Sequence, residues 1–134
     1  MKSKYLGVYR NNYAPSRDEF PWRAALKRYV NSKPEYTNIG YTRTEESAGC
    51  LYNIFALSTF GKGAIINDID MTEEIEEEMN ELIEHIDGFS EVIERSIAVL
   101  EEFGPDIKVH ESHVPEVPDN AVLLSKFSNA MPKT

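Results

Sequence analysis

Polar and apolar residues alternate in three short stretches of the first third of the chain, and each alternation predicts a β-strand. These stretches cover residues 4–11, 22–29 and 36–41. Segments rich in turn-forming residues, at residues 12–20 and 31–34, separate them. The side chains expected to face the core are Leu6, Val8, Trp22, Ala24, Leu26, Thr37 and Ile39.

A helix is predicted between Thr44 and Gly61, where the apolar spacing changes to three and four residues. The hydroxyl of Thr44 can accept a hydrogen bond from an unpaired amide of the first turn, and Gly61 is typical of a helix end. Apolar side chains occupy two opposite faces of this helix. A sheet covers only one of them, so we expect the second half of the chain to cover the other, which consists of Cys50, Ile54 and Leu57.

The second half of the chain contains an acidic amphipathic stretch, which we interpret as one long helix within residues 68–104. Asp70 and Glu73 have the spacing of a capping box at its start, and Gly104 with the following proline ends it. Gly88 could divide the stretch, but the heptad phase continues through it unchanged, so we expect at most a bend there. The heptad seam, typical of a coiled coil, predicts a homodimer or higher homo-oligomer that pairs through Ile75, Met79, Leu82, Ile86, Phe89, Ile93 and Leu100.

The remaining residues, 105–134, are rich in proline and predict an extended arm, within which the apolar residues 121–127 are expected to dock. The chain therefore divides into a sheet-and-helix domain at residues 1–67, an acidic helical dimerisation segment at residues 68–104, and this arm.

Charge is distributed unevenly along the chain. Residues 1–66 hold ten Lys and Arg against five Asp and Glu, a net +5, whereas residues 67–134 hold four against eighteen, a net −14. We expect the two halves to face different partners, or each other. The glutamates of the predicted acidic helix most simply form a solvated face, but they could also cover the basic half or imitate the phosphate row of DNA.

Several motifs of the first half carry a resemblance to a known family. They are G-V-Y-R at residues 7–10, W-R-A-A-L at 22–26, I-G-Y at 39–41, T-E-E-S-A-G-C-L-Y-N-I-F-A at 44–56 and F-G-K-G-A-I-I-N at 60–67. In order and spacing they resemble an AP2/ERF-type DNA-binding domain, in the form found in phage and mobile-element proteins. The resemblance covers residues 5–67. It implies an α+β fold, in which a three-stranded antiparallel sheet packs on one helix and its outer face enters the major groove of DNA.

The candidate binding residues lie on the outer face of the predicted sheet. Where plant members of the family place arginines and a tryptophan, this chain carries mainly tyrosine and asparagine, with Lys27 as a cation. Aromatic rings between cations can stack bases and hold phosphates, although tyrosine is also common in strands whose outer face is merely solvated. The candidates for contact with nucleic acid or a nucleotide are Tyr9, Arg10, Asn11, Arg23, Lys27, Tyr36 and Asn38.

The expected function is that of a small, non-enzymatic, phage-type protein that binds nucleic acid through this sheet face. The alternative is an anti-defence protein that sequesters a nucleotide immune signal at a subunit interface, or that blocks a host protein with its acidic surface. The single Cys50 cannot form an internal disulfide, and no apolar run reaches the roughly 20 residues of a membrane span. We therefore expect a cytoplasmic protein without a membrane partner, in a bacterial host if it is phage-encoded.

No catalytic residue, metal site or cofactor is predicted. The His-Asn-His constellation of the nucleases that often accompany this domain is missing from the sequence. His110 and His113 stand three residues apart without a third ligand nearby, which falls short of a metal site. Cys50 lies among apolar residues of the predicted helix, so a buried structural thiol is expected rather than a nucleophile.

Overall fold

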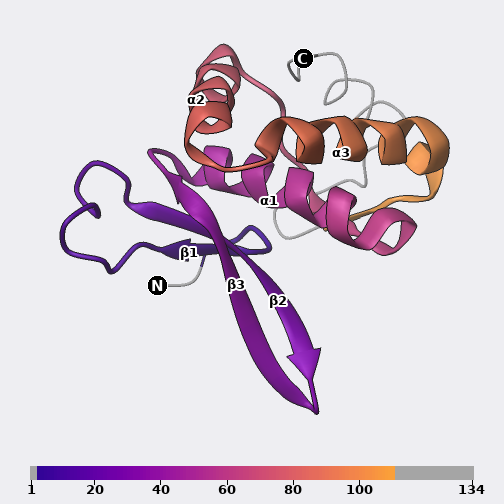
Figure 1. Ribbon diagram of the computed structural model, residues 1–134, viewed down its shortest axis with the longest axis horizontal. Helices are drawn as coiled ribbons and strands as arrows, with labels where there is room; N and C mark the ends of the chain where they lie inside the picture. Colours follow the sequence, from indigo (N-terminus) through magenta and orange to yellow (C-terminus); the bar gives the residue numbers. More distant parts are fainter. Residues whose placement is uncertain (1–2, 111–134) are drawn as a thin grey trace.

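A computed structural model describes residues 3–110 of the chain and has an α+β fold, which confirms the predicted fold class (Figure 1). Three strands form an antiparallel sheet of order β1-β2-β3, and two further strands, β4 and β5, form a parallel pair. The elements in chain order are β1 (Val8–Arg10), β2 (Trp22–Val30), β3 (Lys33–Thr42), α1 (Glu45–Phe60), η1 (Gly61–Gly63), β4 (Ile65–Asn67), α2 (Glu73–His85), α3 (Phe89–Phe103), η2 (Gly104–Asp106) and β5 (Lys108–His110).

Helix α1 lies at the centre of the molecule, between the sheet and the other two helices (Figure 1). Its start is capped as predicted, because the Thr44 hydroxyl accepts a hydrogen bond from the amide of Ser47, and its C-cap is Gly61 at φ 59°. Cys50, Ile54 and Leu57 are fully buried. Helix α3 runs along the side of α1 that faces away from the sheet, and the ring of Phe89 stacks on Phe55 with centroids 5.6 Å apart. The second half of the chain therefore packs on α1, in one core cluster that includes Cys50, Ile54 and Leu57.

The long helix predicted for residues 68–104 is wrong, because the structure contains two helices there. Gly88 adopts a left-handed conformation at φ 73°, which a glycine reaches at no steric cost, and the chain turns between His85 and Phe89. The first of these helices is capped by Thr72 rather than Asp70, since the Thr72 hydroxyl accepts from the amide of Ile75 at 3.2 Å.

The predicted dimer seam is covered within a single chain. Ile75, Met79, Phe89, Ile93 and Leu100 are buried in the same core cluster as α1, and Leu82 and Ile86 pack against that cluster. A heptad spacing describes any helix that buries one stripe, and here the partner of the stripe is the chain's own α1. The five buried side chains are therefore not available to pair with a second chain along the predicted seam.

The arm predicted to be extended from residue 105 is partly folded. Residues 104–106 form η2, Ile107 is fully buried, and β5 pairs with β4 in parallel register, with Ile66 opposite Val109. The rest of the predicted arm, with the apolar residues 121–127, lies outside the described residues. Across residues 3–110, no helix has the length and apolar character that crossing a membrane requires.

Two features of the sheet differ from the simple alternation read from the sequence. A β-bulge between Ala24 and Ala25 shifts the register against β3, so that both alanines are fully buried, although simple alternation with Ala24 and Leu26 places Ala25 on the outer face. Gly7, at φ 72°, breaks the first stretch, so the strand begins at Val8 and Tyr5 is buried in the core instead of facing out.

The hairpin formed by β2 and β3 projects beyond the helices (Figure 1). Its two turn residues, Asn31 and Ser32, both have positive φ, at 53° and 66°, as a two-residue type I′ turn requires. Residues 27–38 are exposed on both faces of the ribbon, including Thr37, which was expected to face the core. Apart from the contact of the Tyr36 ring with Tyr9 of β1, this part of the hairpin is held by its cross-strand ladder.

Candidate nucleic-acid interface

The outer face of the sheet, opposite α1, carries a hollow of about 590 Å³. We call it the aromatic hollow, because four of its nine lining residues are tyrosines. The strand register explains how they meet, since Arg23 lies directly opposite Tyr9 on β1 and opposite Tyr41 on β3, and Lys27 lies opposite Tyr36. The complete lining is Tyr9, Arg10, Asn11, Asn12, Tyr13, Arg23, Lys27, Tyr36 and Tyr41.

Cations and rings alternate across the aromatic hollow. The Arg23 guanidinium lies 5.3 Å from the centroid of the Tyr9 ring, and the Lys27 ammonium lies 5.8 Å from that of Tyr36. The two rings meet edge to face, with centroids 5.8 Å apart and an interplanar angle of 87°. Such contacts fix the side chains before any ligand arrives, which lowers the ordering cost of binding.

The charged side chains that line the aromatic hollow are all positive. Arg10, Arg23 and Lys27 line it, and no acid is among the described residues that do. The Nε of Arg23 is buried and has no hydrogen-bond partner among the described residues. A buried donor of this kind is normally paired.

Protonation states in the aromatic hollow suit an anionic ligand at neutral pH. Burial raises the pKa of the Tyr9 phenol, which therefore stays neutral and can donate a hydrogen bond. The pKa of the Lys27 ammonium is also raised, first by its hydrogen bond with Tyr29 and then by the charges of nearby phenols, so it stays cationic. Tyr36 leaves half of its surface exposed, which gives a base a ring to stack on.

Most of the binding residues predicted from the sequence meet in this place. Tyr9, Arg10, Arg23, Lys27 and Tyr36 line the aromatic hollow, as does Asn11. Asn38 does not, and lies instead at a separate groove beside α2.

Asn11 lines the aromatic hollow, but its side chain already forms hydrogen bonds within the loop that follows it. It is buried, its amide nitrogen donates to the hydroxyl of Ser16 at 3.0 Å and to the carbonyl of Phe20 at 2.8 Å, and its oxygen accepts from the amide of Tyr13. Asn11 therefore holds the loop of residues 12–20 in shape rather than offering its amide to a base. Asn12, Tyr13 and Tyr41 line the hollow although the sequence did not predict them. Tyr41 can be identified as a lining residue only once it is known to pair with Arg23 across the strands.

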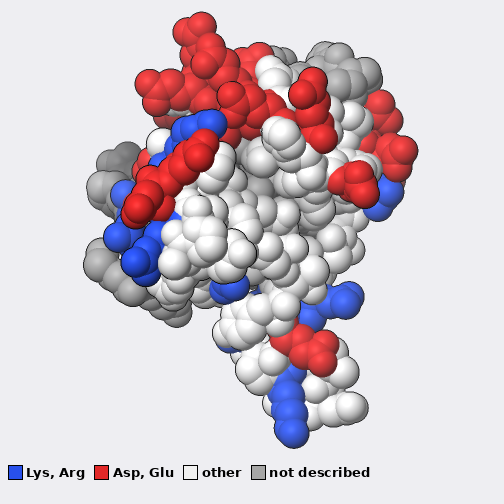
Figure 2. Space-filling model, turned by 60° about the vertical axis from the view of Figure 1, so that its left-hand side comes forward, with Lys and Arg blue, Asp and Glu red and all other residues white. Residues whose placement is uncertain are grey.

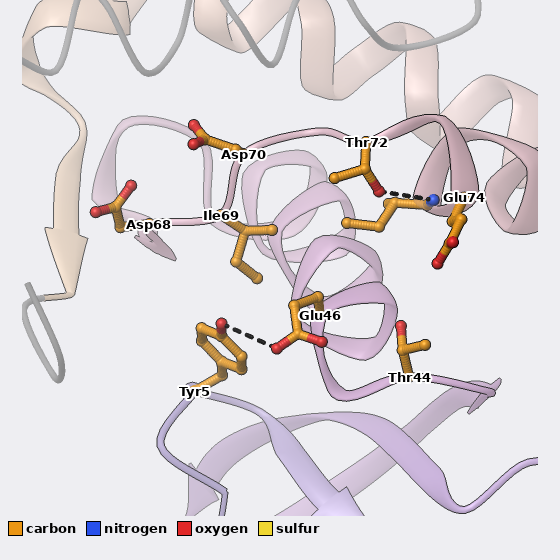
Figure 3. Close-up of a pocket in the computed structure, with 9 residues that line it drawn as sticks. Tyr5, Thr44, Glu46, Asp68, Ile69, Asp70, Thr72 and Glu74 are labelled. Carbon is orange, nitrogen blue, oxygen red and sulfur yellow. Dashed lines mark hydrogen bonds between the residues drawn. The ribbon is translucent and has the colours of Figure 1, made fainter.

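A second, smaller hollow of about 430 Å³ is acidic (Figure 3). Asp68, Asp70, Glu46 and Glu74 line it, together with Tyr5, whose hydroxyl donates to Glu46 at 3.4 Å. Burial, followed by the charges of Glu46 and Glu45, raises the pKa of Tyr5 to about 12. No cation stands among the described residues of this lining, so it repels phosphate.

The acidic side chains of the described residues do not assemble into a metal-binding group. Residues 3–110 contain no cluster of three or more histidine, cysteine, aspartate or glutamate side chains with the geometry to hold an ion. His113 of the predicted histidine pair lies outside these residues, and His110 is half-buried in β5.

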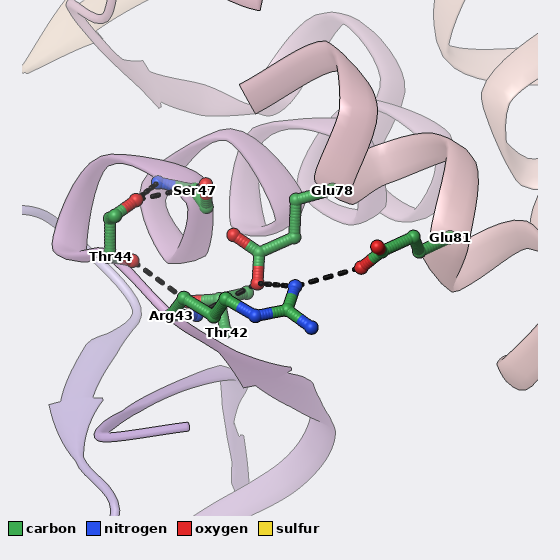
Figure 4. A network of polar contacts seen from close by, with 6 residues as sticks. All are labelled: Thr42, Arg43, Thr44, Ser47, Glu78 and Glu81. Atoms are coloured by element: carbon green, nitrogen blue, oxygen red, sulfur yellow. Dashed lines mark hydrogen bonds and ion pairs between the residues drawn. The ribbon is translucent and has the colours of Figure 1, made fainter. Parts of the chain in front are cut away.

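Arg43 joins the sheet to α2 (Figure 4). Its backbone amide donates to the carboxylate of Glu78 at 2.7 Å, and its guanidinium donates to Glu81 at 2.7 Å. The hydrogen bond with Glu81 raises the pKa of the Arg43 guanidinium further, so this group stays charged. Glu78 is buried and Arg43 lies at the junction of β3 and α1, and this contact fixes α2 against the end of the sheet.

Charge is segregated on the surface in the same way as along the sequence. Acidic side chains cover the end of the molecule that holds α2, and basic side chains lie along the hairpin and beside the loop that precedes β2 (Figure 2). Comparison with protein-family models, with curated proteins and with solved structures found no match.

Proposed function

We propose that this protein binds nucleic acid through the aromatic hollow, with an unpaired base stacked on Tyr36 and the flanking phosphates held by Arg23 and Lys27. The observation that carries the proposal is the composition of the hollow, in which three cations and four tyrosines line about 590 Å³ without an acid among them.

A single strand suits the aromatic hollow better than the edge of a duplex. Reading base edges relies on bidentate contacts from arginine or asparagine, but Asn11 is engaged by its own loop and the Arg10 guanidinium lies over the ring of Trp22 at 4.9 Å. Exposed ring faces between cations are instead what single strands require. The resemblance to AP2/ERF-type domains favours a duplex, since a two-stranded ribbon such as the β2–β3 hairpin fits a major groove. Both ligands therefore belong in the test.

A free nucleotide is the second candidate, and the size of the aromatic hollow favours it. Small-ligand sites enclose roughly 300–1,000 Å³, a range that includes this hollow. A nucleotide bound there would use the same stacking and the same cations. A nucleotide would bind with one molecule per hollow. Its affinity would depend less on salt than that of a strand, since fewer phosphates take part.

The test is fluorescence anisotropy with a labelled single strand of about 12 nucleotides, a duplex of the same sequence and a cyclic dinucleotide, each measured across a range of salt. We expect the single strand to bind most tightly, with affinity falling as salt rises at a logarithmic slope of about −1.4 for the two phosphate contacts of Arg23 and Lys27. Replacing Tyr36 by leucine removes the stacking ring, which contributes about 1–3 kcal/mol, and should weaken binding by roughly 5- to 150-fold.

Two controls separate this role from a general loss of folding or charge. Tyr36→Phe keeps the ring and should bind nearly as the parent does. Arg17→Ala removes an exposed arginine from the loop outside the aromatic hollow and should change affinity little, whereas Arg23→Ala should weaken binding and reduce the salt slope by about 0.7. Equal effects of the Arg17 and Arg23 substitutions would show that binding is diffuse. Failure to bind any of the three ligands at low salt would exclude the proposal.

A further inference from the structure

A groove of about 930 Å³ lies between β3, the loop of residues 12–20 and α2. We call it the α2 groove. Its floor is apolar and includes Ile39, Leu82 and Ile86, each of which is partly buried against the core. Ile86 approaches the sheet closely at Gly40, where an added Cβ would stand 3.3 Å from its Cδ1 atom.

The rim of the α2 groove is acidic. Glu19 rises from the loop and Glu84 from α2, and both are exposed, whereas Glu81 already holds Arg43. The groove thus combines an apolar floor with two exposed carboxylates on opposite walls. A ligand that fits it carries positive charge beside exposed apolar side chains.

The tip of the β2–β3 hairpin, residues 28–33, has that complementary character. Tyr29 and Val30 leave 67% and 41% of their surface exposed, although both are apolar enough to bury. Arg28 and Lys33 flank them, and both are exposed. The strand register places Lys33 opposite Val30, so a cation and an apolar side chain share one face of the tip.

We propose that the hairpin tip of one copy of this protein docks in the α2 groove of a second copy. The chain itself carries both complementary surfaces, which favours a second copy over an unrelated cationic protein. The tip cannot reach its own groove, because the hairpin extends away from α2 (Figure 1). Such a contact is heterologous, joining two different surfaces, and it leaves one tip and one groove free for further copies.

The contact is small, so the association is weak and depends on charge. The tip has a few residues to insert, which places the interface at the low end of protein–protein contacts, below about 1,200 Å². Its charged groups are exposed before docking and are screened within about 10 Å at 0.1 M salt. We therefore expect association at low salt and high protein concentration that reverses as salt is added.

Charge reversal with mixing tests the proposal in sedimentation velocity. Arg28→Glu with Lys33→Glu makes the tip acidic, and Glu19→Lys with Glu84→Lys makes the α2 groove basic. Each double variant alone should weaken self-association by at least about tenfold, because its own tip and groove then carry like charges. The equimolar mixture should recover association, since the acidic tip of one variant then meets the basic groove of the other.

A matched control has the same change in net charge in another place. Glu101→Lys with Glu102→Lys alters two exposed residues of α3 outside the α2 groove and should leave self-association within about twofold of the parent. A parent chain that stays monomeric at low salt and high concentration would overturn the proposal. So would a mixture that stays monomeric although both double variants retain their circular dichroism spectrum, or binding of the groove to a cationic peptide with no self-association.

This inference and the proposed function fail separately. The Glu19 and Glu84 substitutions leave the aromatic hollow unchanged, so nucleic-acid binding should persist when self-association is lost. Arg23→Ala should have the converse effect, since Arg23 lies in the aromatic hollow and outside the hairpin tip.

Discussion

Replacing Asn67 by alanine should destabilise the fold more than replacing an exposed asparagine does. The Asn67 side chain is buried and takes part in hydrogen bonds that connect three segments of the chain. Its Oδ1 atom accepts from the amide of Leu6 at 2.7 Å, and its Nδ2 atom donates to the carbonyl of Leu6 at 3.1 Å. The backbone of Asn67 is in turn held by Asn53 of α1, which accepts from its amide at 2.7 Å and donates to its carbonyl at 3.0 Å. The pair thus joins the segment before β1 to α1 and β4.

The magnitude follows from the bonds lost. Alanine removes the two bonds to Leu6 and a longer one of 3.3 Å to Asn53, while the backbone bonds of residue 67 remain. Each good bond contributes about 1 kcal/mol, and each backbone group left buried without a partner costs about 1–3 kcal/mol. Leu6 is half-buried, so water can reach its freed groups in part. The expected loss is about 2–4 kcal/mol of the free energy of unfolding.

Equilibrium unfolding in urea measures this loss as a lower midpoint at unchanged slope. Asn67→Asp should be at least as damaging as alanine, because a carboxylate can still accept from the amide of Leu6 but meets its carbonyl oxygen without a proton to donate. Asn12→Ala changes an exposed asparagine and should stay within about 0.5 kcal/mol of the parent. If the alanine variants at positions 67 and 12 unfolded at the same urea concentration, the side-chain hydrogen bonds of Asn67 would make no measurable contribution to the free energy of unfolding.

Two further predictions concern Gly7 and Cys50. Gly7→Ala should cost at least about 1–3 kcal/mol, because residue 7 has φ 72° and an added Cβ would stand 1.9 Å from Cδ1 of Tyr52; Gly63→Ala, with open space around it, is the matched comparison in the same urea experiment. Burial raises the pKa of the Cys50 thiol from 9.0 to about 12. Between pH 9 and pH 12 the folded chain therefore keeps the thiol proton, whereas the unfolded chain loses it. The free energy of unfolding should fall across this range by up to about 1.4 kcal/mol per pH unit. Cys50→Ala should lack this difference, and an equal pH dependence in both chains would contradict it.

The architecture of the first half could be predicted from its sequence because each signal there is local. Alternation, turn residues and the Thr44 cap depend on a few neighbouring residues, and the structure confirms three strands followed by a capped helix. The bulge at Ala24 and Ala25 could not be predicted, since it depends on how β2 pairs with β3. It is also the reason why Ala25 faces the core.

The second half shows where a periodic pattern stops being informative. Heptad spacing establishes that one stripe of a helix is buried, but the same spacing results whether the partner is a second chain or an earlier helix of the same chain. The partner here is α1, whose second apolar face had no other cover. The break between the two helices lies in the backbone of Ile86, which is extended, and of Gly88, which is left-handed, and the heptad phase encodes neither conformation.

The sequence predicts most of the residues that line the candidate site, but it does not show which of them are free to contact a ligand. Alternation put Tyr9, Arg23, Lys27 and Tyr36 on one face, and the register brings them into one hollow. That Asn11 is engaged in holding its loop depends on Ser16 and Phe20, whose positions no strand pattern gives.

The net charge of −9 is compatible with binding a polyanion, because charge acts locally in salt. A phosphate in the aromatic hollow is surrounded by Arg10, Arg23 and Lys27, and interactions with exposed acids more than about 8 Å away are largely screened at physiological ionic strength. The acids of α2 cover another end of the molecule (Figure 2). At low salt the field of the α2 acids extends further and repels a polyanion from the α2 end of the molecule. The uneven charge distribution then orients the sheet face toward the polyanion.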